Sequence, residues 1–399
     1  NSAARNAALS LRLSGWRVLT SAERNEQSHE DPASVEAAVL RDVRRMDAAQ
    51  GMPEVWGAHT EREEMTDLKA QILDAGRGWC AHTHGHDNSR AALAAARAAL
   101  EWVKKEQNKP NAEIIVPAMT FSATYEAVLR AGMKPVVIDI DHMTLSPTIM
   151  DYASALSGRT AAMIVVHLHG WPYEGTKTLR RLCQAHGIFL IEDCAQAFGA
   201  ELDGVKVGTI GHAAAFSFYP TKPLGGIGDG GAVTFQSEWA AMRASATRNH
   251  GRMDGIQGFA GYNSRLDEAN AAVLRMRLAV YPKTLERLRT CAGRYESRIR
   301  LVGTCAVEHA RHSLPAPYVY PISVPKRDEL KALLLEAGVE TRLHYDPALS
   351  GLPYVKEKCP AADYAAKTLL SLPCHRGMSA DDTGFVCDAV NKCVRSLGI

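Results

Sequence analysis

An aspartate and a lysine close to predicted strand ends are the residues of this chain best placed to do chemistry. Asp193 follows an apolar run at residues 188–191, and Lys222 follows a second apolar run at residues 213–218. Ligands of open α/β sheets bind beyond the carboxyl ends of the strands, so we expect both side chains at the ligand-binding edge. A lysine here is compatible with a Schiff base whose partner acid serves a ring nitrogen, or with an ordinary salt bridge.

A phosphate-binding role for Lys222 fits the sequence poorly. A P-loop is a glycine-rich turn that ends in Gly-Lys-Ser/Thr and opens a helix. Here the glycines come after the lysine, and Pro223 follows it directly. A single lysine can also simply lie on the protein surface. The surrounding residues must distinguish that position from a Schiff base or a salt bridge.

Three motifs around the pair resemble the cofactor site of the DegT/DnrJ/StrS family of pyridoxal-phosphate (PLP) sugar aminotransferases. They are the acidic motif EDCAQ at residues 192–196, the lysine motif SFYPTK at residues 217–222 and the glycine loop GDGG at residues 228–231. Together the motifs are highly specific, whereas each alone is weak. The similarity runs from about Val55 to the C-terminus, and it implies PLP as the cofactor and fold type I of the aspartate aminotransferase superfamily.

The resemblance assigns roles to individual residues. Lys222 would bind PLP covalently and move a proton as general base and acid, and Asp193 would hold the protonated ring nitrogen. These two are the predicted catalytic residues. The predicted cofactor-binding residues are Ser89, Arg90, Phe121, Asp193, Ala195, Gln196, Ser217, Lys222 and Asn263.

Each predicted cofactor-binding residue has its own implied contact. Phe121 and Ala195 would pack on opposite faces of the ring, and Gln196 would bind its phenolic oxygen. Ser217 would bind the phosphate. Asn263 belongs to a motif that in relatives reaches the phosphate of the neighbouring subunit, which implies a homodimer with shared active sites.

One turn departs from the family pattern. Relatives have Gly-Thr before the helix expected at residues 89–103, and backbone amides at that helix N-terminus bind the phosphate. This chain has Ser89-Arg90 instead. Three outcomes stay open: weaker phosphate binding, a charge-assisted contact from Arg90, or an exposed Arg90.

The implied reaction moves an amino group from glutamate or glutamine to a keto sugar, expected to be nucleotide-linked, or to a keto-cyclitol. It would serve amino-sugar or natural-product biosynthesis. Dehydration of a sugar is one alternative, but relatives that dehydrate have histidine where this chain has Lys222. A non-catalytic PLP-fold sensor or binding protein is the other, and the Ser89-Arg90 departure leaves it open.

Alternating strand and helix patterns predict an α/β fold with a mostly parallel central sheet and a smaller α+β C-terminal domain. Helices are expected at residues 123–131 and 176–186, and strands at 114–116, 135–140, 162–168, 231–235, 318–324 and 339–343, with only helices over 359–399. A helical stretch over 267–299, interrupted at Tyr281-Pro282, would bridge two domains. We divide the chain into an N-terminal arm (1–30), a large PLP-binding domain (31–270), and the bridging helix with the small C-terminal domain (271–399).

Composition excludes several classes of protein. The chain has 399 residues, 46% of them hydrophobic, and a net charge of +2, so we expect a globular enzyme that binds neither nucleic acid nor membranes. Nine cysteines without a CxxC pair argue against a disulfide framework or a zinc site and favour a reducing cytoplasm.

His82, His84 and His86 alternate, but no second ligand group stands nearby, so no metal is predicted. Residues 1–22 hold three arginines and no acid, which leaves a trimmed organelle-targeting segment as the alternative to a packed arm.

Overall fold

The computed structural model describes residues 79–82, 103–104, 107, 109, 111–253, 256–300, 305–306 and 312–399. Ser89, Arg90, the predicted N-terminal arm and two residues of the histidine cluster (His84 and His86) lie outside the described residues. Most of the helix expected at residues 89–103 also lies outside them.

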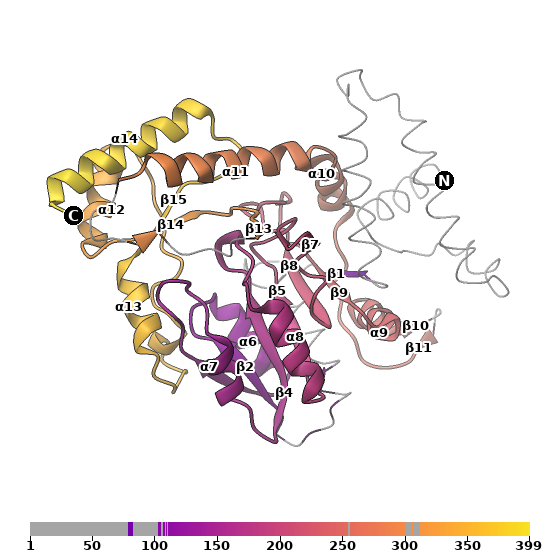
Figure 1. Ribbon diagram of the computed structural model, residues 1–399. Helices are drawn as coiled ribbons and strands as arrows, with labels where there is room; N and C mark the ends of the chain where they lie inside the picture. The colour runs from indigo at the N-terminus through magenta and orange to yellow at the C-terminus, as the bar shows by residue number, and fades with distance from the viewer. Residues whose placement is uncertain are drawn as a thin grey trace.

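A seven-stranded sheet forms the centre of the molecule, with strand order β1-β9-β8-β5-β4-β2-β3 (Figure 1). Its members are β1 (Trp79–His82), β2 (Glu113–Pro117), β3 (Lys134–Ile138), β4 (Thr160–Val166), β5 (Phe189–Asp193), β8 (Ala213–Ser217) and β9 (Gly231–Phe235). Only β9 runs antiparallel to its two neighbours; the other pairings among these strands are parallel. The predicted α/β fold with a mostly parallel sheet is therefore confirmed.

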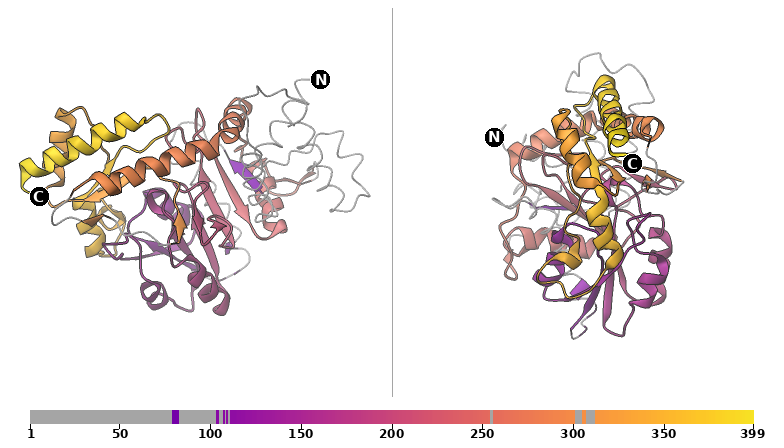
Figure 2. Two further views of the ribbon diagram at one scale, coloured as in Figure 1. Left: turned by 45° about the horizontal axis from the view of Figure 1, so that its top comes forward. Right: turned by 90° about the vertical axis from the view of Figure 1, so that its left-hand side faces the viewer.

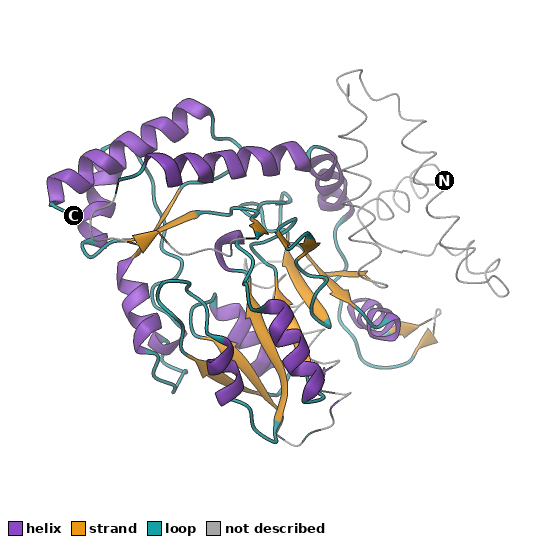
Figure 3. Ribbon diagram, viewed as in Figure 1, coloured by secondary structure: helices purple, strands orange, loops and turns teal. Residues whose placement is uncertain are grey.

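Helices cover both faces of this sheet (Figure 3). Successive side chains of a strand point to opposite faces, so Ile114 and Ile115 join different apolar clusters. The cluster around Ile114 takes in α6 and α9, and the one around Ile115 takes in α7 and α8. The bounds are α6 (Ser122–Arg130), α7 (Ile149–Ser154), α8 (Thr176–Ala185) and α9 (Glu238–Arg248).

The C-terminal residues pack a further apolar cluster around a small antiparallel sheet, β12-β14-β15. The long helices α11 and α14 lie side by side over it (Figures 1 and 2). The elements are α10 (Glu268–Ala279), α11 (Tyr281–Arg298), β12 (Cys305–Ala306), β14 (Tyr320–Ser323), α12 (Arg327–Glu336), α13 (Pro360–Thr368), β15 (Leu369–Leu372) and α14 (Ala380–Leu397). The helix break expected at Tyr281-Pro282 is present, because α11 begins at Tyr281 with Pro282 in its first turn. A domain boundary near residue 270 stays a prediction.

Short elements complete the described chain. They are β6 (Glu201–Leu202), β7 (Val205–Lys206), β10 (Arg252–Met253), β11 (Ile256–Gln257), β13 (Ser313–Leu314), η1 (Leu168–Gly170) and η2 (Leu349–Gly351). Among the helices of the described ranges, none has the length and apolar character that crossing a membrane requires.

Two predictions for the C-terminal part are wrong. The strand expected at residues 339–343 is reduced to a single bridge between Arg342 and Ser371. β14 pairs with β12 on one side and with β15 on the other, and β15 lies in a region expected to contain only helices. Its sequence, LLSL, is too short to show a period of two, and leucine favours helices, so only the pairing with β14 identifies it.

Candidate active site

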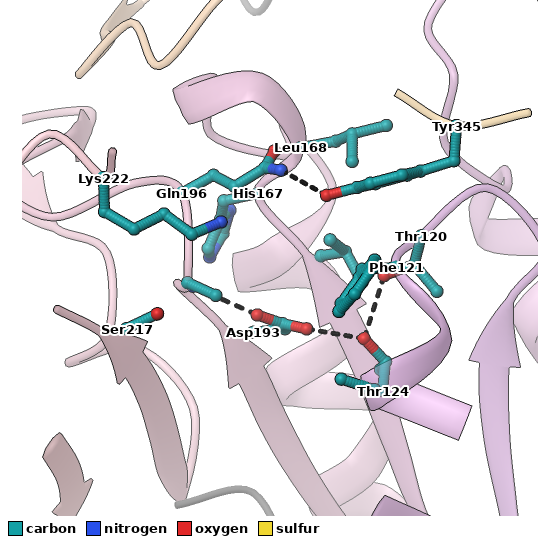
Figure 4. Close-up of a pocket in the computed structure, with 13 residues that line it drawn as sticks. Thr120, Phe121, Thr124, His167, Leu168, Asp193, Gln196, Ser217, Lys222 and Tyr345 are labelled. Atoms are coloured by element: carbon teal, nitrogen blue, oxygen red, sulfur yellow. Dashed lines mark hydrogen bonds between the residues drawn. The ribbon is translucent and has the colours of Figure 1, made fainter. Parts of the chain in front are cut away.

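Lys222 lies in the loop that connects β8 to β9, at the carboxyl edge of the sheet (Figure 4). Its backbone N–H donates to Tyr219 O at 2.9 Å, and its Nζ lies 4.4 Å from the ring centroid of Tyr318. Burial of the ammonium lowers the pKa of Lys222 from 10.5 to about 8, while the charge of Asp193 opposes the shift. Lys222 is therefore a much better nucleophile and base at neutral pH than an exposed lysine.

Helix α10 fixes the glycine-rich segment that follows Lys222. Asn270 accepts from Ile227 N at 3.0 Å and donates to Asp229 O at 3.0 Å, and Arg277 donates to Gly226 O at 2.7 Å. A Cβ at Gly226 would collide with the Asn270 side chain. The glycine is needed because the loop backbone packs directly on the helix.

Asp193 is the last residue of β5, and its carboxylate is held from two sides. Oδ2 accepts from Thr124 Oγ1 at 2.7 Å, and Oδ1 accepts from Ala195 N at 3.0 Å. Thr124 in turn shares a 2.9 Å hydrogen bond with the buried Thr120. Both donors to Asp193 are neutral, so they orient the carboxylate without neutralising it.

Gln196 is oriented by contacts at both ends of its amide. Oε1 accepts from His169 N at 2.5 Å, and Nε2 donates to Tyr345 Oη at 2.6 Å. The Tyr345 ring also lies 5.4 Å from the ring of Phe121. Burial raises the pKa of Tyr345 well above its ordinary value, so its hydroxyl stays protonated.

Six of the predicted site residues line one pocket: Phe121, Asp193, Ala195, Gln196, Ser217 and Lys222. Figure 4 shows Lys222, Gln196, Ser217 and Asp193 around a common space, with Phe121 at its side. The side chain of Phe121 is accessible, since 43% of the residue is exposed, whereas Ser217 is buried at the end of β8. The pocket therefore offers an amine, a carboxylate, a hydroxyl and an aromatic face to one ligand.

His167, which also lines the pocket, forms a fully buried pair with Glu192. His167 Nδ1 accepts from Tyr173 N at 3.0 Å, so Nε2 carries the proton and donates to Glu192 Oε2 at 3.0 Å. Three backbone N–H groups donate to the same carboxylate, those of Gly208, Ile210 and Gly211.

Four donors occupy the four lone-pair sites of the Glu192 carboxylate. Burial, together with Glu192 and Asp193, raises the pKa of the neighbouring Cys194 well above its usual value, so it stays a thiol. Although His167, Glu192 and Cys194 come close enough to share a metal ion, their chemistry is that of a structural hydrogen-bond network. We therefore assign these three residues a structural role: they stabilise the end of β5.

Asn263 is not brought to this pocket. It is exposed and forms an antiparallel bridge with Asn249. The cofactor contact of Asn263 stays a prediction.

Sequence reasoning missed several residues that the fold adds to the site. Thr120 and Thr124 line the pocket, and Tyr318 lies beside Lys222. Tyr345 also lines the pocket, and the His344-Tyr345 pair resembles a family feature near the cleft. Thr120 and Thr124 had a readable signal, because they are four residues apart around a predicted helix start. Trp171 packs in the C-terminal apolar cluster.

A mostly parallel sheet with a buried lysine and a hydrogen-bonded aspartate at its carboxyl edge is typical of α/β enzymes that use a lysine as nucleophile or base. The chain belongs to the DegT/DnrJ/EryC1/StrS aminotransferase family, whose model matches residues 80–391. The resemblance seen in the sequence is thereby confirmed.

Individual relatives agree with this membership. A UDP-N-acetyl-3-dehydro-alpha-D-glucosamine 3-aminotransferase of Acidithiobacillus ferrooxidans is 36% identical over 77% of this chain and 82% of its own. A pleiotropic regulatory protein of Geobacillus stearothermophilus is 35% identical over 72% of this chain and 79% of its own. Among solved structures, that of S. venezuelae DesV in complex with a ketimine intermediate superimposes with a TM-score of 0.74. The match covers 90% of this chain and 97% of that chain, with 30% sequence identity.

Proposed function

We propose that this aminotransferase uses PLP and transfers an amino group from glutamate or glutamine to a nucleotide-linked keto sugar. The observation that carries the proposal is the pairing of Lys222, whose pKa is lowered to about 8, with the anchored carboxylate of Asp193 in one pocket. A carboxylate fixed by neutral donors suits a cationic ring nitrogen, and a desolvated amine suits an aldehyde carbon.

The residues present fit PLP. Asp193 would hold the ring nitrogen, and Phe121 and Ala195 would pack on the ring from opposite sides. Gln196 Nε2 has a second N–H beyond the one given to Tyr345, and that N–H would bind the phenolic oxygen. Ser217 would bind the phosphate. When bound, PLP supplies an electron sink for cleaving a C–H bond of the amino donor.

The protein's own part in the reaction is proton movement and orientation. Lys222 Nζ would take the proton from the donor's α-carbon and return it, as general base and then acid. Its pKa of about 8 is close to neutral pH, which suits both directions of transfer. The hydrogen bonds of Thr124 and Ala195 would keep the Asp193 carboxylate in line with the ring nitrogen throughout.

The substrate class is inferred from relatives. The A. ferrooxidans relative is named for a UDP-linked keto amino sugar, and it matches most of both chains. The G. stearothermophilus relative is instead named as a regulator, which keeps a non-catalytic function as the second candidate. Retention of Lys222 and Asp193 together favours catalysis, since a sensor needs no proton-transfer base.

We further propose a homodimer with shared active sites, in a cytoplasmic enzyme. Asn263 is exposed and away from its own pocket, as a residue that reaches a partner's phosphate would be. Arg90, next to Ser89, would add a charge-assisted phosphate contact in place of the family's Gly-Thr.

A single-turnover reaction with glutamate tests the function. PLP-loaded protein is mixed with an excess of glutamate and no keto sugar, and 2-oxoglutarate is measured. We expect one equivalent per site, and we expect none from Lys222→Ala loaded with the same amount of PLP. Bound PLP that yields neither 2-oxoglutarate from glutamate nor 2-oxoglutaramate from glutamine would favour the sensor instead.

A further inference from the structure

The pocket residue Tyr345 is delivered by a segment that starts in the C-terminal part of the chain. Residues 344–349 lead from the C-terminal part back to the large sheet. There, Leu349 N donates to Ala118 O at 3.0 Å. Tyr345 uses its hydroxyl to accept from Gln196. The position of this one ring therefore determines how the Gln196 amide is held.

The next residue, Asp346, is bound by a buried arginine. Asp346 Oδ2 accepts from Arg327 NH2 at 2.7 Å, and Arg327 is only 4% exposed. NH1 of the same guanidinium donates to Ala366 O at 2.9 Å and to Leu369 O at 3.2 Å, at the end of α13. A planar guanidinium fixed by these carbonyls can hold Asp346 in only one place.

Arg327 has a second acidic partner that serves as a natural control. Nε donates to Asp328 Oδ1 at 2.6 Å, but the Asp328 side chain is 80% exposed, on the same helix α12. Asp328 has no connection to the Tyr345 segment beyond this shared arginine. Two acids thus contact the same guanidinium, and only Asp346 adjoins a pocket residue.

We propose that Arg327 and Asp346 are positioning residues that hold Tyr345 against Gln196 and so shape the cofactor pocket from the C-terminal part of the chain. The identity of the ligand in this proposal rests on the proposed PLP function. The positioning itself does not, because the Asp346–Arg327 and Tyr345–Gln196 contacts join side chains of this chain and involve no ligand atom.

The first test is hydrogen exchange of the cofactor-free protein. Asp346→Ala is expected to raise the amide exchange of residues 344–349 at least about tenfold, because a lost charge-assisted bond releases the segment. Asp328→Ala is the matched control and should leave that segment unchanged. Equal exchange in the two variants overturns the proposal, whether or not the protein binds PLP.

The second test is PLP affinity, followed by the absorbance of the bound cofactor. Asp346→Ala and Tyr345→Phe should each weaken binding about fivefold, as expected for one hydrogen bond. The double variant should be no weaker than about fivefold, because Asp346 acts through Tyr345. Multiplied effects, about 25-fold, would overturn the proposal.

A conservative variant separates positioning from folding. Asp346→Asn keeps an oxygen that accepts from Arg327, so it should recover PLP affinity to within about twofold of wild type. If Asp346→Ala does not fold, Asp346→Asn is compared with Asp328→Asn by the same exchange measurement. Amide exchange of residues 344–349 should then rise in Asp346→Asn, by less than about tenfold, and stay unchanged in Asp328→Asn. An absence of PLP binding by the wild type would refute the proposed function, and the exchange result would still decide the positioning.

Discussion

The titration of Lys222 is the property that the pocket geometry predicts most sharply. Burial lowers its pKa from 10.5 to about 8. At pH 7 the neutral fraction of the amine is then about 10%, against about 0.03% for a lysine with the ordinary value. The free amine should therefore be about 300-fold more abundant than on an exposed lysine.

Acetylation of the cofactor-free protein measures this. Trace labelling with acetic anhydride between pH 6 and 11, followed by peptide mass spectrometry, gives the midpoint for Lys222, with the exposed Lys367 as a control for the reagent. We expect a midpoint near 8. Asp193→Asn should lower the midpoint further, because the carboxylate charge favours the ammonium form.

Two results would refute this reasoning. A midpoint for Lys222 near 10.5 would show that the pocket does not desolvate the amine. A midpoint that rises in Asp193→Asn would show that the two groups do not attract each other. The Tyr318 ring, 4.4 Å from Nζ, also favours the ammonium, so Tyr318→Leu should move the midpoint in the same direction as Asp193→Asn.

The same pKa shift predicts how stability depends on pH. Between pH 8 and 10.5 the unfolded chain keeps a proton on Lys222 that the folded chain has lost. The contribution of Lys222 to the free energy of unfolding should therefore rise with pH through that window and be unfavourable below it. Replacing Lys222 by Met should stabilise the cofactor-free protein at pH 7 by on the order of 1–3 kcal/mol, measured by urea unfolding.

Three further predictions concern single side chains. Asp193→Asn should retain bound PLP but lose most single-turnover transamination with glutamate, and a rate near wild type would contradict the ring-nitrogen role. Glu192→Gln should lower the free energy of unfolding by about 3 kcal/mol in urea, because a buried four-donor carboxylate is disrupted; an unchanged midpoint would contradict this. Asn263→Ala should weaken PLP affinity without unfolding the chain, and PLP retained at full occupancy by a monomer in sedimentation would rule out the shared site.

The strand ends carrying Lys222 and Asp193 could be predicted from the sequence, because short apolar runs bounded by glycine and polar residues mark buried strands. Asp193 is the last residue of β5, at the strand end where it was expected. Glu192, one residue earlier, faces the opposite way, and its carboxylate accepts four structural hydrogen bonds. A period of two separates such neighbours, but only the fold shows which of them meets the ligand.

The remainder of the site comes from contacts that are distant in sequence. Tyr345 lies 149 residues from Gln196, and Thr124 lies 69 residues from Asp193. No local pattern encodes such pairs, since they arise when the C-terminal segment and α6 pack against the sheet. The missed strand β15 has the same origin, because its identity depends on its partner β14.

Reduction of the PLP-loaded protein with borohydride tests the central claim most directly. The reagent fixes the cofactor to the amine that holds it, and peptide mapping by mass spectrometry then identifies that residue. The account predicts a single phosphopyridoxyl adduct on Lys222, with none formed in Lys222→Ala. An adduct on another lysine, or no adduct at saturating PLP, would contradict it.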